Sequence, residues 1–304
     1  MADIQVRRAR PLLGTVVEIG VAGCCGEDAL HAAVDTAFAA VALVHSLMSY
    51  QDPDSELSGL NRQAAAVGQK VHSHTYRVLA AALRMAALSD GAFDPVVAPQ
   101  LEKWGYLPAC DAPVDPSATW RDVELSAGDC VRFLRPLRLD LGGIAKGFAV
   151  DVAIDALRSS GIETCMVNAG GDLRVTGRAQ QIDLRHPADP SRLAHGVKLQ
   201  NRALATSAAY FSRKEVRGEA VSALVDARGG RAYLGGSSVS VMAGECMIAD
   251  ALTKILIFAD AAVAERALAE YGATALVLAG QEPVGHRISP IAVIGPREFC
   301  LTTA

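Results

Sequence analysis

The chain has 304 residues, of which 51% are hydrophobic and 20% are charged, and its formal net charge is -4. This composition is typical of a globular protein with one large core or two closely packed lobes. Because no sustained block of Lys or Arg occurs, we expect neither nucleic acid nor a membrane surface as a partner.

The N-terminus carries Arg7, Arg8 and Arg10, but Pro11 and Gly14 follow in place of a long apolar stretch with a cleavage site. We therefore expect no signal peptide, lipoprotein signal or membrane-spanning segment, and a cytoplasmic location. The seven cysteines form no CxxC pair and show no zinc-ligand spacing. They are expected to be reduced and mostly buried thiols.

The hydrophobic pattern predicts a helix-rich first third. A strand over 15–21 comes first, and the helices that follow are expected at 27–48, 55–61, 75–88 and 97–104. The stretch 108–116, with three prolines, is too short to be a convincing linker between domains.

From residue 123 onward, strands dominate. One helix is predicted at 144–160, two more at 247–259 and 261–271, and strands at 165–167, 182–184, 196–206, 220–225, 238–242 and 273–278. Helices grouped early and strands grouped later indicate an α+β fold, with mixed sheets and packed helices in a single domain over 1–304.

A candidate anion site lies between residues 139 and 177. Asp140 precedes Gly142 and Gly143, and a helix is expected to begin at about Ile144 with Lys146 in its first turn. Free N–H groups, the positive helix end and an ammonium together attract phosphate. Asn168-Ala169-Gly170-Gly171-Asp172 follows one helix later, which suggests one shared pocket. The alternative is a tight turn with Lys146 solvated at the surface.

Three further segments carry polar or aromatic groups next to turns. Tyr50 precedes a rigid turn and can cover a flat heterocycle, or it can simply cap the core. Ala92, Phe93 and Asp94 form a binding loop or a plain turn. Asp250 and Lys254 share a helix face beside Thr253, so they either hold a hard cation such as Mg²⁺ or pair with each other without any ligand.

Taken in order, these segments resemble the FAD:protein FMN transferase family, the ApbE-like flavin transferases. The matching pieces cover most of the chain from Leu12 to Lys254: LLGTVVEI (12–19), MSYQDPDSELSGLN (48–61), GAFDPVVAPQLEKWGY (91–106), the 139–177 stretch, LATSAAY (204–210) and ADALTK (249–254). The resemblance implies two intimately associated lobes with a flavin cleft between them. It further implies transfer of FMN from FAD to a Thr or Ser of an acceptor flavoprotein, with release of AMP.

Residue roles follow from the same resemblance. It implies FAD contacts at Leu13, Tyr50, Ala92, Phe93, Asp94, Asp140, Lys146 and Leu224. It also implies a Mg²⁺ site at the Gly143 carbonyl, Asp250 and Thr253.

The chain departs from the family pattern at three positions. Ala223 stands where the family has a histidine that is a candidate for activating the acceptor hydroxyl, so the catalytic base is unknown; His186, His195 or a carboxylate could supply it. Lys254 replaces a metal-ligating Thr, and Ala208 replaces a Gly. We hypothesise that Lys254 occupies part of the metal volume and makes metal binding weak or absent. The alternatives to a transferase are a catalytically impaired FAD-binding protein and a pyrophosphatase that splits FAD into FMN and AMP.

Overall fold

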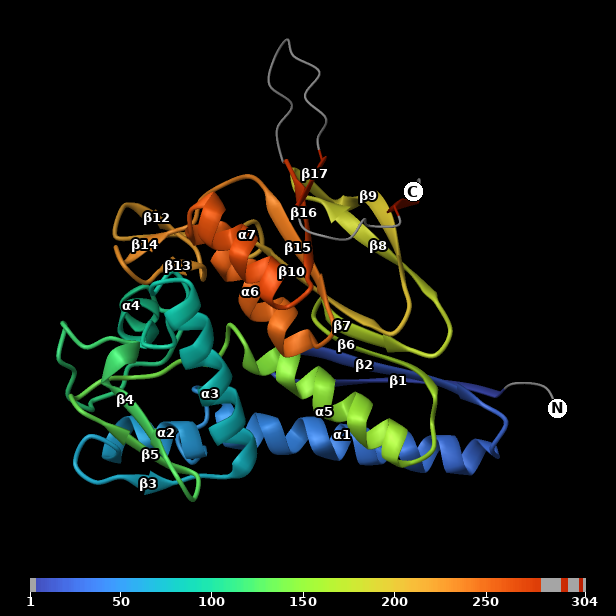
Figure 1. The fold of residues 1–304 in the computed structure, drawn as a ribbon, viewed down its shortest axis with the longest axis horizontal. Coiled ribbons are helices and arrows are strands. Elements are labelled where there is room, and N and C mark those ends of the chain that lie inside the picture. Colours follow the sequence, from blue (N-terminus) through green and yellow to red (C-terminus); the bar gives the residue numbers. More distant parts are fainter. Residues whose placement is uncertain (1–3, 280–290, 295–300, 303–304) are drawn as a thin grey trace, which may run out of the picture.

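An eight-stranded antiparallel sheet organises the fold (Figure 1). The computed structural model describes residues 4–279, 291–294 and 301–302. Along the sheet the strands run β1 (Ile4–Leu12), β2 (Thr15–Gly23), β6 (Thr164–Ala169), β7 (Asp172–Thr176), β10 (Arg202–Ala208), β15 (Ser238–Ala243), β16 (Thr274–Leu278) and β17 (Ile291–Ile294). Strands from near both ends of the chain therefore belong to one sheet and form its two edges.

Three helices, α1 (Glu27–Met48), α5 (Ala145–Ser159) and α6 (Cys246–Phe258), pack against this sheet. α5 lies between α1 and α6, and α7 (Ala261–Glu270) packs on α6 (Figure 1). The buried faces of these helices and the inward side chains of β2 and β6 form the main hydrophobic core. Amphipathic helices that bury one face against a sheet are what the sequence pattern predicts.

The opposite face of the sheet is covered by a small sheet of β8 (Gln180–His186), β9 (Asp189–Leu199) and β18 (Leu301–Thr302). Leu184, Val197 and Leu199 from this hairpin form a second hydrophobic core together with Leu204 and Leu276 of the main sheet. Helices, sheet and hairpin thus form successive layers.

A second lobe lies beyond the end of α1. It contains α2 (Glu56–Gln63), α3 (Ser73–Leu88), α4 (Ala98–Lys103), a 3₁₀ turn (Trp120–Asp122) and the sheet β3 (Gln69–Lys70), β5 (Cys130–Phe133) and β4 (Val123–Ser126) (Figure 1). Two short hairpins, β11 (Lys214–Val216) with β12 (Glu219–Val221) and β13 (Val225–Asp226) with β14 (Arg231–Ala232), follow β10 in the chain. The α+β expectation is confirmed, and the single domain over 1–304 stays a prediction.

Three strand predictions were incomplete. β1 was missed because Arg7, Arg8 and Arg10 hide its alternation; it is an edge strand, where charged side chains are common. The strand expected at 196–206 is broken into β9 and β10 by a turn with Asn201 at φ 51°. The strand expected at 220–225 is likewise divided between β12 and β13.

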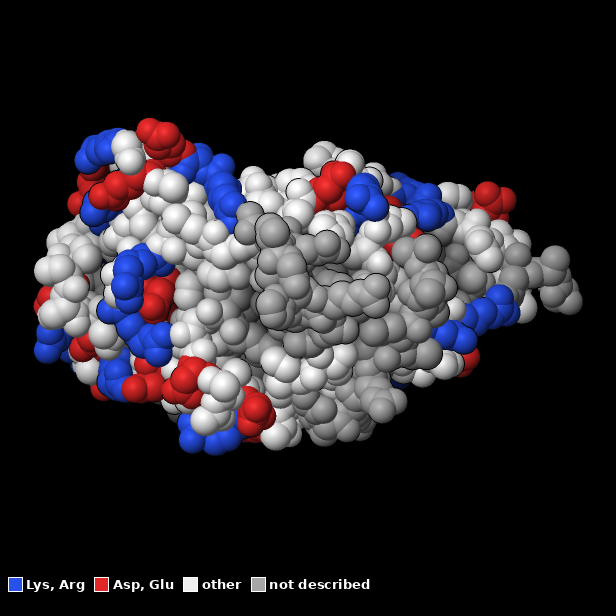
Figure 2. All heavy atoms as spheres, turned by 90° about the horizontal axis from the view of Figure 1, so that it is seen from above, with Lys and Arg blue, Asp and Glu red and all other residues white. Residues whose placement is uncertain are grey.

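The surface and the cysteines bear on other expectations. By length and hydropathy α1 could cross a bilayer, but Leu30, Val34, Phe38 and Val41 are buried in the core. On the face shown in Figure 2, the described basic side chains lie in separate groups, most of them next to acidic side chains, and no basic patch extends across this face. The expectation of mostly buried thiols is wrong for the described cysteines. Cys165 and Cys246 are buried, whereas Cys24 and Cys25, in the loop between β2 and α1, are exposed. Cys300 lies outside the described residues.

Candidate active site

A cavity of about 680 Å³ lies where the main sheet, the end of α1 and the second lobe meet. This volume is typical of small-molecule sites. Its wall comes from segments far apart in sequence: 13–14, 44–51, 101–107, 140–146, 170–172, 206–212, 223–224 and Lys254. A smaller cavity of about 70 Å³ shares Asp140, Gly143 and Leu224 with it and adds Ala92, Phe93 and Asp94. All eight predicted FAD contacts therefore line these two adjoining cavities.

Leu13 reaches the cavity from the two-residue loop between β1 and β2. Leu12 pairs with Thr15, and Leu13 and Gly14 have φ values of 58° and 69°. Positive φ at both loop residues is the geometry that matches the twist of a tight hairpin. A leucine is unusual there, and this conformation is consistent with a functional position.

Hydrogen bonds to the backbone of Leu139 and Asp140 position the Asp140 side chain. Asn61 of α2 donates to the Leu139 carbonyl at 3.0 Å and accepts from the Leu139 N–H at 2.8 Å, and the Asp140 N–H donates to the Pro95 carbonyl at 2.8 Å. The Asp140 side chain keeps partial exposure and lines both cavities. Enclosure by the protein nevertheless raises its pKa, against the attraction of Lys146 and Lys254.

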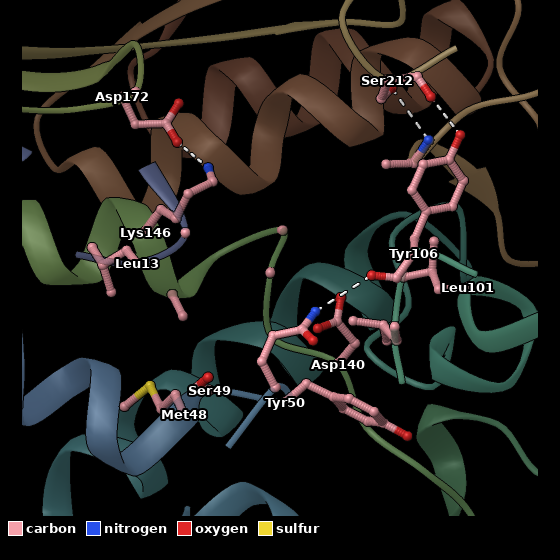
Figure 3. A pocket seen from close by; sticks show the side chains of 18 of the residues that line it. Leu13, Met48, Ser49, Tyr50, Leu101, Tyr106, Asp140, Lys146, Asp172 and Ser212 are labelled. Atoms are coloured by element: carbon pink, nitrogen blue, oxygen red, sulfur yellow. Dashed lines mark hydrogen bonds and ion pairs between the residues drawn. The ribbon is translucent and has the colours of Figure 1, made fainter. Parts of the chain in front are cut away.

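Lys146 lies in the first turn of α5, as predicted, and contacts the Asp172 carboxylate (Figure 3). Its Nζ is also 3.5 Å from Asp250 Oδ2, and a third of the side chain remains exposed. Burial opposes the charged form, but Asp172 and Asp250 outweigh it and hold the pKa of Lys146 above its ordinary value. Lys146 is thus a permanent cation in the cavity wall and is not a solvated surface lysine.

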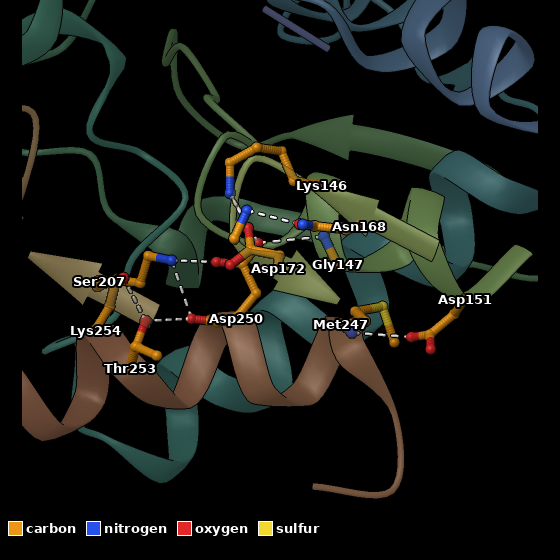
Figure 4. A network of polar contacts seen from close by, with 11 residues as sticks. Lys146, Gly147, Asp151, Asn168, Asp172, Ser207, Met247, Asp250, Thr253 and Lys254 are labelled. Atoms are coloured by element: carbon orange, nitrogen blue, oxygen red, sulfur yellow. Dashed lines mark hydrogen bonds and ion pairs between the residues drawn. The ribbon is translucent and has the colours of Figure 1, made fainter. Parts of the chain in front are cut away.

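Lys254 contacts Asp250 Oδ1 and donates to the Asp250 carbonyl at 3.0 Å (Figure 4). Asp250 Oδ2 accepts from the Gly147 N–H at 3.3 Å. Burial raises the pKa of Asp250, yet the two ammonium groups lower it overall. Thr253 Oγ1 donates to the Asp250 carbonyl at 2.7 Å and lies 2.7 Å from Ser207 Oγ.

The predicted Mg²⁺ ligands do not fit a divalent cation. Asp250 accepts from the Gly147 N–H and contacts the Lys254 ammonium, and the Thr253 hydroxyl is bonded to the Asp250 carbonyl and to Ser207. Neither residue lines the cavity. Among the described residues, no group of three His, Cys, Asp or Glu side chains could hold a metal ion. Magnesium prefers several oxygen ligands in octahedral geometry, whereas here an ammonium contacts the Asp250 carboxylate.

Asp151 joins the two helices that carry these lysines. From α5 it accepts the N–H groups of Cys246 and Met247, both at 2.9 Å, at the start of α6 (Figure 4). It also accepts from Arg174 Nη1 at 2.8 Å. Gly147 allows the close approach, since a Cβ there would lie 2.4 Å from the Cys246 carbonyl oxygen.

Tyr50 belongs to the core and also borders the cavity. It is buried and its hydroxyl donates to Glu102 at 2.5 Å, while Glu102 pairs with Arg138 at 3.2 Å. Residue Tyr50 also lines the cavity (Figure 3). Burial and the Glu102 carboxylate raise the pKa of Tyr50, so its hydroxyl stays protonated.

Asp94 shapes the loop at the smaller cavity. It accepts from the Val96 N–H at 2.8 Å and from the Trp120 N–H at 3.4 Å. Burial raises the pKa of Asp94 to about 6, in spite of these donors.

Ala223 lines both cavities and has no group that moves a proton. His186 and His195 lie on β8 and β9 and are not in the cavity wall, whereas His45, in the last turn of α1, is. Sequence reasoning also missed Tyr106 and Ser212, whose contact closes the cavity on the side opposite Leu13 (Figure 3). Helical periodicity places His45 near the end of α1, but only the fold brings that end to the cavity.

Comparisons with known proteins agree with this geometry. The ApbE family matches residues 13–278. The FAD:protein FMN transferase of Vibrio cholerae is 30% identical over 272 residues, which cover 82% of this chain and 79% of the relative. That of Treponema pallidum is 28% identical over 278 residues, 82% and 77% of the two chains.

Solved structures show the same fold. The flavin transferase ApbE of Vibrio cholerae superposes with a TM-score of 0.77 at 26% identity and covers 97% of both chains. The ApbE protein of Thermotoga maritima gives a TM-score of 0.79 at 26% identity, covering 90% of this chain and 94% of its own. On the match over 13–278 and these likenesses, the chain belongs to the ApbE family.

Proposed function

We propose that this protein binds FAD in the 680 Å³ cavity and transfers FMN from it to a Thr or Ser hydroxyl of an acceptor flavoprotein. The observation that carries the proposal is the pairing of a ligand-sized cavity with two lysines, Lys146 and Lys254, in its wall. Membership of the ApbE family supports the same activity, since the relatives named above are FAD:protein FMN transferases.

Apolar residues of the cavity wall would contact the flavin ring, and charged residues would contact the diphosphate. Leu13, Tyr50 and Leu224 provide surfaces on which a flavin ring can lie, and Ala92 and Phe93 extend them into the smaller cavity. Lys146 and Lys254 are available to the diphosphate. Positive groups fixed beside a phosphoryl group stabilise the charge that develops during transfer.

The reaction exchanges one P–O bond for another. The bond between the FMN phosphorus and the bridging oxygen breaks, and that oxygen leaves with AMP. A new bond forms from the phosphorus to the acceptor hydroxyl oxygen, which loses its proton. We assign this proton to Asp140, because its carboxylate, like Ala223, lines both cavities, and because burial raises its pKa and so makes the carboxylate a stronger base.

The proposed reaction uses no Mg²⁺, because Asp250 and Thr253, two of the three predicted ligands, are already bonded to other protein groups. The acceptor protein, and a cytoplasmic location without nucleic-acid or membrane partners, stay predictions.

One assay tests the function. The protein is incubated with FAD and an acceptor peptide containing a Thr among small residues, and AMP and the peptide mass are followed. AMP together with a flavinylated peptide supports the transferase. AMP without peptide modification indicates a pyrophosphatase. Unchanged FAD indicates a catalytically impaired FAD-binding protein, the alternative suggested by Ala223 in place of the family's histidine. Asp140→Asn should lower transfer by about 10²- to 10⁴-fold, as loss of a general base does, and unchanged transfer would remove Asp140 from the role.

A further inference from the structure

Lys254 lies between the cavity and Asp250. It lines both cavities, whereas Asp250 lies behind it with only 1% of its side chain exposed. The ammonium contacts the Oδ1 atom and the backbone carbonyl of Asp250 (Figure 4). Any cation that approaches Asp250 from the cavity therefore meets the Lys254 ammonium first.

The other two predicted Mg²⁺ ligands, Gly143 and Thr253, also have close protein neighbours. The Lys254 side chain packs beside Gly143, with its Cε 3.6 Å from where a Cβ on Gly143 would lie. Thr253 bonds to Asp250 and Ser207. On the other side, Lys146 Nζ lies 3.5 Å from Asp250 Oδ2. One carboxylate thus holds two ammonium groups at the edge of a ligand-sized cavity.

We propose that Lys254 is a built-in counter-ion for the substrate diphosphate, so that this protein binds FAD and neutralises its phosphates without a divalent cation. The proposal rests on the proposed function. An ammonium on a four-carbon stem can turn from Asp250 to a phosphate oxygen, and lysine is a common phosphate-binding residue. Asp250 then has a positioning role, because it holds Lys254 at the cavity in the absence of substrate.

Two measurements on the unaltered protein test this directly. Titration with Mn²⁺ alone, followed by the electron paramagnetic resonance signal of the free ion, should show no binding. The affinity for FAD, measured by flavin fluorescence, should be the same in Mg²⁺ and in EDTA. Neither measurement depends on a variant that could fail to fold.

Lys254→Thr sharpens the test by removing the ammonium and adding a hydroxyl. Its FAD affinity in EDTA should fall about 10- to 100-fold, as expected for the loss of one charge-assisted contact. Mg²⁺ should restore part of the affinity, and Mn²⁺ should now bind. Lys198→Thr, an exposed lysine on β9, is the matched control and should behave as the unaltered protein.

Tight Mn²⁺ binding by the unaltered protein, or loss of its FAD affinity in EDTA, would overturn the inference and leave the proposed function standing. The same holds if Lys254→Thr binds FAD in EDTA as tightly as the unaltered protein. Failure to bind FAD in both Mg²⁺ and EDTA would overturn the proposed function and this inference together.

Discussion

Asp151 connects the two helices of the site, so its removal should destabilise the whole fold. Asp151→Ala deletes the acceptor for the Cys246 and Met247 N–H groups and for Arg174 Nη1. Asp151 is 2% exposed, so water cannot readily replace it.

The size of the effect follows from what is left unpaired. Burial raises the pKa of Asp151 despite its three donors, so the ion pair itself contributes little. Removing one partner of a buried pair nevertheless costs about 3–5 kcal/mol, and losing a helix cap costs about 1 kcal/mol. The Arg174 side chain keeps 18% exposure and can partly reach solvent, which favours a total of about 3 kcal/mol.

Urea unfolding at neutral pH, followed by circular dichroism, measures this value as a change in midpoint at constant slope. Asp155→Ala, one turn later on the exposed side of α5, is the matched control and should change stability by less than about 0.5 kcal/mol. If Asp151→Ala also stays within about 1 kcal/mol of the unaltered protein, Asp151 does not join α5 to α6 as described.

Three other variants test separate parts of the site. Tyr50→Phe should lower stability by about 1 kcal/mol, because the hydrogen bond to Glu102 is lost, but it should keep the affinity for FAD. Tyr50→Ala should lose that affinity. If fluorescence titrations give the two variants equal FAD affinities, the ring is not a flavin contact. Asp94 has a folded pKa of about 6 against an ordinary 3.8, so its stabilising contribution is present below about pH 4 and lost as pH rises through 6. The free energy of unfolding of Asp94→Asn, relative to that of the unaltered protein, should therefore rise by up to about 3 kcal/mol as the pH increases from about 4 to above 6. Urea unfolding measures this difference, and a difference that does not vary with pH would contradict the burial of Asp94. Gly147→Ala should destabilise the protein by about 1–3 kcal/mol, because the added Cβ collides with the backbone of Cys246. Gly59→Ala is the control: it has open space around it and should be neutral or stabilising. Similar melting temperatures for the two variants would argue against a close approach of α5 to α6.

Local features of the site could be predicted from the sequence. The contact between Asp250 and Lys254 follows from their spacing of four on one helix, and Lys146 is in the first turn of α5 as expected. These predictions depend only on residues within a few positions of each other. The order of the motifs then indicated the family and, through it, the residues of the cavity wall.

Contacts between distant segments could not be predicted in this way. Asn61 holds Leu139 across 78 positions, and Asp151 caps a helix that begins 95 positions later. Neither residue stands out in the sequence, because an Asn in a short helix and an Asp in a long one are ordinary surface residues until the fold buries them. The same holds for His45, which reaches the cavity only through the packing of α1.

The pairing of β2 with β6 has a consequence for synthesis of the chain. β2 ends at Gly23, but its partner begins only at Thr164. While some 140 further residues are made, the growing chain therefore carries β2 with one edge unpaired. This strand includes the apolar residues Val17 and Ile19. Unpaired edges of this kind recruit other strands. Fragments that stop before β6 should consequently aggregate, whereas the full-length product covers the edge itself.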